Sequence, residues 1–122
     1  MVLATAPACA SSWEAVAHTP GAVDGDPYER LRYLMMSGKG TRPVRVDVES
    51  SYAAVIFVVS GATMTQTLSF DAIAKVEIET MPRRNGWVVS VYDSAGEYIW
   101  GYAAVDEAAA REFVDVLAAI RN

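Results

Sequence analysis

The residue types that most often carry catalysis are scarce in this 122-residue chain, which has one histidine and one cysteine. A general base such as His18 needs an orienting carboxylate and a nucleophile beside it, and its place next to Thr19 and Pro20 is typical of an ordinary exposed side chain. Cys9 stands among Ala and Pro, whereas a reactive thiolate needs basic neighbours. A zinc site would have to draw mostly on Asp and Glu. We therefore expect no enzyme, no metal and no cofactor.

Two short motifs resemble ligand-binding loops but do not meet their requirements. The Gly-Lys-Gly-Thr sequence at 38–41 lacks the phosphate-loop order, in which Lys is followed directly by Ser or Thr. Asp24-Gly25-Asp26 would begin a calcium loop, but Glu29 and Met35 occupy the places of the central Gly and the bidentate Glu. A helix end explains the first motif, and a helix N-cap at Asp26 explains the second.

Positive charge gathers in one part of an acidic chain. The net charge is −5, yet residues 29–45 hold five bases and one acid. The acidic balance argues against nucleic-acid binding, and a charge run is typical of a solvated face. Two adjacent arginines at a predicted hairpin tip could bind phosphate or lipid headgroups. Each arginine would contribute about 1 kcal/mol to membrane binding, which makes a weak contact. The candidate anion-binding residues are Lys39, Arg42, Arg83 and Arg84.

Aromatic residues are concentrated at 87–102, where two strands flank a turn at 93–96. Closing this hairpin with Tyr92 opposite Glu97 pairs Val89 with Trp100 and places the aromatic side chains on one face. That face is either the core beneath a helix or a surface for a partner, including a second copy, because Tyr and Trp are favoured at interfaces. The candidate partner-binding residues are Trp87, Tyr98, Trp100 and Tyr102.

The elements that would hold these residues are two helices and about six strands. Asp26, Pro27 and Glu29 combine three helix-start signals and predict a short helix at 27–37. Asp106 predicts the start of a C-terminal helix at 106–121, whose apolar stripe needs a sheet beneath it. The alternating or continuous apolar runs predict mostly antiparallel strands at 44–48, 53–59, 64–70, 74–79, 87–92 and 97–102.

The domain organisation follows from these elements. Residues 1–25 show no sustained period and are expected to form an irregular arm, and residues 26–122 are expected to form a single α+β domain. The continuous apolar run at 53–59 predicts a strand that is covered on both faces. No run reaches the ~20 apolar residues of a membrane span, and the arm lacks the basic start of a signal peptide. A cytoplasmic location is the expectation.

Over residues 43–122, the consecutive strands, the 87–102 hairpin and the 106–121 helix resemble a pleckstrin-homology-like domain. The resemblance implies a bent antiparallel sheet closed at one end by the C-terminal helix, and binding of proteins, peptides or anionic lipid headgroups. The chain differs in having six predicted strands in place of seven, and in having Phe113 where such helices carry Trp. An open sheet covered by two helices is the competing architecture.

These observations favour a noncatalytic protein-binding domain, with a homodimer as one form of that interaction. One alternative is a binder of anionic headgroups or phosphate through the basic loops. Another is an acidic inhibitor protein, which the charge and the small size suggest.

Overall fold

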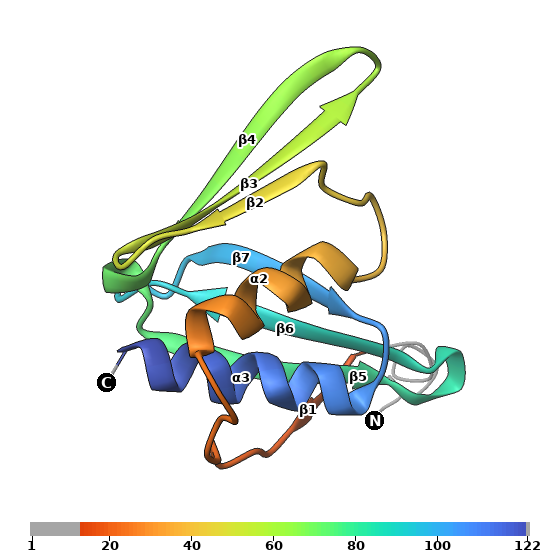
Figure 1. Ribbon diagram of the computed structural model, residues 1–122. Helices are drawn as coiled ribbons and strands as arrows, with labels where there is room; N and C mark the ends of the chain where they lie inside the picture. Colours follow the sequence, from red (N-terminus) through yellow and green to blue (C-terminus); the bar gives the residue numbers. More distant parts are fainter. Residues whose placement is uncertain (1–12, 122) are drawn as a thin grey trace.

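Two antiparallel sheets and two α-helices make up the computed structural model, which describes residues 13–121 (Figure 1). The four-stranded sheet has the order β1-β5-β6-β7, and the three-stranded sheet has the order β2-β3-β4. All neighbouring strands are antiparallel. The strands are β1 (Glu14–Val16), β2 (Arg45–Val48), β3 (Tyr52–Val59), β4 (Ala62–Ser69), β5 (Lys75–Met81), β6 (Gly86–Tyr92) and β7 (Tyr98–Ala104).

The six predicted strands are all present, but they do not form one sheet. The chain passes from the first sheet to the second through the short 3-10 turn η1 (Phe70–Ala72), and a second such turn, η2 (Pro82–Arg84), joins β5 to β6. The prediction of an irregular arm is wrong for Glu14–Val16, which pairs with β5 as a seventh strand. A three-residue strand is too short to show an alternating pattern. Residues 17–25 of the predicted arm have no helix or strand, as expected, and residues 1–12, with Cys9, lie outside the described part.

Both α-helices begin at the residues that the sequence indicates. α2 (Pro27–Ser37) follows Asp26, whose side chain accepts a hydrogen bond from the N–H of Tyr28 at 2.9 Å. Because β1 precedes it, α2 is an internal helix and not the first element of the described chain. α3 (Glu107–Arg121) follows Asp106, which accepts from the N–H of Ala109 at 2.8 Å. Each N-cap side chain accepts a hydrogen bond from a backbone N–H of the first helical turn, which has no acceptor within the helix.

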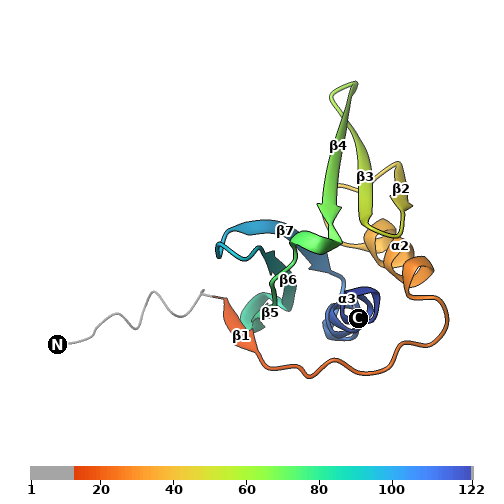
Figure 2. The ribbon, with the colours of Figure 1, turned by 90° about the vertical axis from the view of Figure 1, so that its left-hand side faces the viewer.

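The elements are stacked in layers around one core. In Figure 2, α3 is seen end-on against the curved four-stranded sheet, with α2 beside it and the three-stranded sheet standing beyond α2. α3 packs on β5, β6 and β7, and α2 packs on α3 and β2. The largest fully buried side chains come from both helices and both sheets: Phe113, Leu31, Leu68, Leu117, Val89, Val91 and Val116. We call the helix-facing side of each sheet its inner face.

The distal part of the β3–β4 hairpin projects away from this body (Figure 1). We call residues 56–67 the wing. Its ten consecutive residues from Val58 to Thr67 are all exposed, and Val58, Val59 and Met64 are 49%, 44% and 49% exposed. The expectation of a strand covered on both faces is therefore wrong for the end of β3. Its apolar run predicted burial, but its buried residues, Ala53 and Val55, both lie in the first half of the strand.

Candidate functional site

The β6–β7 hairpin has a different register from the predicted one. Its turn is one residue longer, because Asp93 N–H donates to the carbonyl of Glu97 at 2.9 Å and the Asp93 carboxylate accepts from the N–H groups of Ala95 and Glu97. A bulge then adds Ile99 as an extra residue between two pairs of the ladder. The observed pairs are Tyr92–Tyr98, Val91–Trp100, Val89–Tyr102 and Trp87–Ala104, so the predicted pairs are wrong.

The bulge separates the four candidate aromatic residues. Tyr98 pairs with Tyr92 and lies on the outer face, where it is 61% exposed and its hydroxyl covers Gly101. Tyr102 is only 5% exposed, and its ring stacks on Phe113 of α3 at 4.2 Å between centroids. Two tryptophans, Trp87 and Trp100, are half-buried beside the core. The prediction of one common aromatic face is therefore wrong for Tyr98.

A groove lies between β7 and the inner face of the three-stranded sheet, and we call it the inter-sheet groove. The groove encloses about 90 Å³. One wall is β7 from Trp100 to Ala103, and the opposite wall includes Val55, Phe57 and Gln66. The end of α2 and the loop that follows it close one side, through Met35, Gly38, Lys39, Thr41 and Pro43. Two of the candidate partner-binding residues, Trp100 and Tyr102, thus come together with the candidate cation Lys39.

The β7 wall of this groove exposes backbone hydrogen-bonding groups. β7 is the last strand of its sheet, and the N–H of Lys39 donates to the carbonyl of Ala103 at 2.8 Å. Hence the backbone of Ala103 points away from β6. Because this direction alternates along an antiparallel strand, the N–H and C=O of Gly101 and the N–H of Ala103 also point away from β6. The groove therefore contains donors and acceptors that a further strand can pair with.

The Tyr102 side chain forms part of the buried base of this region. Burial, together with the smaller effect of the nearby carboxylates of Glu112 and Asp106, raises the pKa of Tyr102 to about 12. No described residue makes a hydrogen bond to its hydroxyl. The phenol is consequently neutral at physiological pH. Tyr102 acts here as a packing residue beneath α3, with only its margin in the groove.

The four candidate anion-binding residues lie in two separate loops. Lys39 and Arg42 are exposed in the α2–β2 loop, and Arg83 and Arg84 are exposed in η2. Within residues 13–121, no carboxylate lies within 4.0 Å of these four cations, whereas most of the other basic residues are paired with one. A bidentate contact joins Arg30 to Glu112 across the two helices at 2.6 and 2.8 Å, for example. The four cations therefore do not form one site, but all are accessible.

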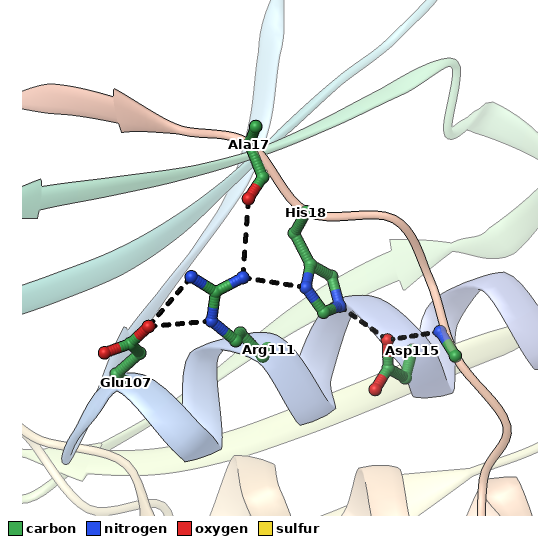
Figure 3. A network of polar contacts seen from close by, with 6 residues as sticks. Ala17, His18, Glu107, Arg111 and Asp115 are labelled. Carbon is green, nitrogen blue, oxygen red and sulfur yellow. Dashed lines mark hydrogen bonds and ion pairs between the residues drawn. The ribbon is translucent and has the colours of Figure 1, made fainter.

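His18 belongs to a polar network on α3 (Figure 3). Its Nε2 lies 2.7 Å from the Asp115 carboxylate, and its Nδ1 lies 3.0 Å from a guanidinium nitrogen of Arg111. Since Arg can only donate, Nδ1 accepts and Nε2–H donates to Asp115. The same carboxylate accepts from the N–H of Gly21 at 2.9 Å. The side chain of His18 is 15% exposed, so the expectation of an ordinary exposed histidine is wrong.

This network holds the segment between β1 and α2 against α3. In Figure 2 that segment passes below α3 on its way from β1 to α2. We call residues 17–21 the strap. Sequence reasoning missed it, although Arg111 and Asp115 lie four residues apart on the polar face of α3, where they can bind a common partner. Both ring nitrogens of His18 are therefore engaged in contacts with α3.

The described residues contain neither a cluster of metal ligands nor a membrane-spanning helix. In residues 13–121, no three His, Cys, Asp or Glu side chains come together as metal ligands would. Neither α2 nor α3 has the length and apolar character needed to cross a membrane. Comparisons of the chain with protein-family models, with curated proteins and with solved structures found no match.

Proposed function

We propose that this protein is a noncatalytic protein-binding domain that holds an extended segment of a partner protein in the inter-sheet groove. The bound segment pairs with β7 as an added fifth strand of the four-stranded sheet. The observation that carries this proposal is the open edge of β7, where the backbone groups of Gly101 and Ala103 face the groove. Strand addition of this kind obtains affinity from main-chain hydrogen bonds.

The side chains of the groove supply the second part of recognition. In an added strand, alternate side chains point to opposite faces of the sheet. Those on the inner side would meet Trp100 and, across the groove, the partly exposed ring of Phe57. Aromatic side chains in such a position favour apolar residues at every second place in the partner segment. Lys39, on the side of the groove that the α2–β2 loop closes, adds a preference for a carboxylate of the partner segment.

The polar clusters of the protein support a binding role rather than a catalytic one. Both ring nitrogens of His18 are engaged in holding the strap. On the outer face of the four-stranded sheet, Glu77 is 3.4 Å from Lys75 and Glu79 accepts a hydrogen bond from Ser90 at 3.1 Å. These carboxylates are neutralised or hydrogen-bonded, which does not suit paired general acid and base chemistry.

The second candidate function is the binding of anionic lipid headgroups or phosphate. It is favoured by one observation, the absence of a described carboxylate partner for Lys39, Arg42, Arg83 and Arg84. The resemblance to pleckstrin-homology-like domains also remains a proposal, which the two antiparallel sheets and the C-terminal helix support. In both candidate functions the sheets and helices hold the binding residues in place, at the β7 edge for a peptide and in the basic loops for an anion.

The groove is tested by selecting binders from a phage-displayed library of random 12-residue peptides against the immobilised protein. Ala103→Pro removes one N–H that faces the groove and leaves the β6–β7 ladder intact, because that N–H does not point at β6. Ala103→Val keeps the N–H and is the matched control. We expect the selected peptides to bind the wild type and Ala103→Val, and to bind Ala103→Pro at least tenfold more weakly. Peptides that bind all three proteins equally would refute strand addition at β7.

A further inference from the structure

Besides the edge of β7, the molecule has a second open sheet edge, which runs along β4. The peptide-binding groove does not use this edge. β4 is the last strand of the three-stranded sheet. At its base, the N–H of Phe70 donates to the carbonyl of Ser51 at 2.9 Å, which sets the direction of the backbone groups along the pair with β3. By alternation, the N–H and C=O groups of Thr63, Thr65 and Thr67 point away from β3.

This edge lacks the features that normally prevent sheets from joining. Exposed edge strands are usually protected by charged side chains, by proline, by a bulge or by being very short. β4 has eight residues, pairs with β3 without a register shift and contains neither a charge nor a proline. The whole stretch from Ser50 to Phe70 contains no Asp, Glu, Lys or Arg, although 20% of the chain is charged. An exposed surface that is partly apolar and uncharged, such as the wing, is typical of a surface that another molecule covers.

We propose that this edge is covered by a second copy of the same chain, through antiparallel pairing of the two β4 strands around Thr65. The sequence Thr-Met-Thr-Gln-Thr at 63–67 suits a two-fold axis at its centre. Thr63 of one copy then lies opposite Thr67 of the other, and the two Thr65 residues face each other. Thr63, Thr65 and Thr67 of each copy are all paired in this register, with about six backbone hydrogen bonds in total.

The pairing also explains the uneven distribution of charge. With a net charge of −5, two copies repel each other over most of their surfaces. Contact through the wing adds no like-charged pair, because neither β3 nor β4 carries a charged residue. The isologous contact produces a six-stranded sheet, in which the two bodies lie at opposite ends. In that sheet Met64 and Gln66 of the two copies become neighbours on the inner face.

The oligomeric state tests this proposal. Multi-angle light scattering after size exclusion should give about twice the 13.2 kDa mass of the chain at high protein concentration. Thr65→Lys places two positive charges side by side on the axis, and Thr65→Pro removes an N–H that β3 does not use. Both variants should be monomeric and retain the wild-type circular dichroism. Ser94→Lys, in the exposed β6–β7 turn, makes the same charge change and should remain dimeric.

Amide hydrogen exchange gives a second readout that does not depend on variants. In the dimer, the N–H groups of Thr63, Thr65 and Thr67 should become protected as the protein concentration rises. Those of Met64 and Gln66 point at β3 and should be protected at every concentration. A wild type that stays monomeric, or a dimer that persists in both Thr65 variants, would overturn the proposal. Neither result would bear on the groove, because peptide binding there is measured with Ala103 variants on a different strand.

Discussion

Replacing Tyr102 by phenylalanine should change how stability depends on pH. The ordinary pKa of a tyrosine in an unfolded chain is ~10, and in the folded protein burial raises the pKa of Tyr102 to about 12. A raised folded-state pKa means that the neutral phenol stabilises the native state fully below pH 10. This contribution is lost as the pH rises from 10 to 12, because the unfolded chain then ionises more readily.

The size of the effect follows from the same two values. A difference of ~2 pKa units corresponds to about 2.7 kcal/mol above pH 12, and to about 1.4 kcal/mol at pH 11. Below pH 10 the phenol is neutral in both the folded and the unfolded chain, so only the loss of the hydroxyl group decides the effect of the mutation. The Tyr102 hydroxyl has no described hydrogen-bond partner, and an unsatisfied buried hydroxyl opposes folding. Tyr102→Phe should therefore be stabilised by about 1 kcal/mol at pH 8, and should lack the wild-type loss of about 1.4 kcal/mol between pH 8 and pH 11.

Urea unfolding followed by tryptophan fluorescence at pH 8 and pH 11 measures both quantities. Tyr52→Phe is the matched control, because Tyr52 is 39% exposed and lies outside the helix-covered core. It should follow the wild type at both pH values. The reasoning would be refuted if Tyr102→Phe were less stable than the wild type at pH 8 and lost as much stability as the wild type on going to pH 11.

Two further variants test the strap and the basic loops. Asp115→Ala removes the acceptor of His18 and Gly21, so we expect a loss of about 1–3 kcal/mol and faster amide exchange in the strap; unchanged exchange would show that the network does not hold it. Arg83→Glu combined with Arg84→Glu should weaken flotation with anionic vesicles by about 2 kcal/mol, roughly thirtyfold, while neutral vesicles serve as the control. Flotation that this double variant leaves unchanged would exclude η2 as a headgroup site.

The helices and the number of strands after residue 40 were predictable because their signals are local. Asp26 and Asp106 cap their helices by hydrogen bonds within three residues, so the sequence around each cap contains the whole interaction. Strand alternation is equally local. The division into two sheets depends on packing between distant segments, and no local pattern records it.

The candidate site was harder to predict because one inserted residue changes the face of the sheet on which a side chain lies. One extra residue in the turn after Asp93 and the bulge at Ile99 moved Tyr98 to the opposite face. The end of β3 has the composition of a buried strand, yet Val58 and Val59 extend past the helices that would cover them. His18 looked like a loop residue because its partner Asp115 is 97 positions away in the chain.

The pairing of β1 with β5 sets a constraint on the order of folding. Glu14 lies opposite Thr80, and the strap reaches α3 near the other end of the chain. During synthesis β1 leaves the ribosome early, but it has no partner until β5 has followed, and the strap has none until α3 has been made. Such long-range contacts form late, because closing a long loop costs entropy before the contact stabilises it. β1 should accordingly be among the last of the described strands to become protected during refolding.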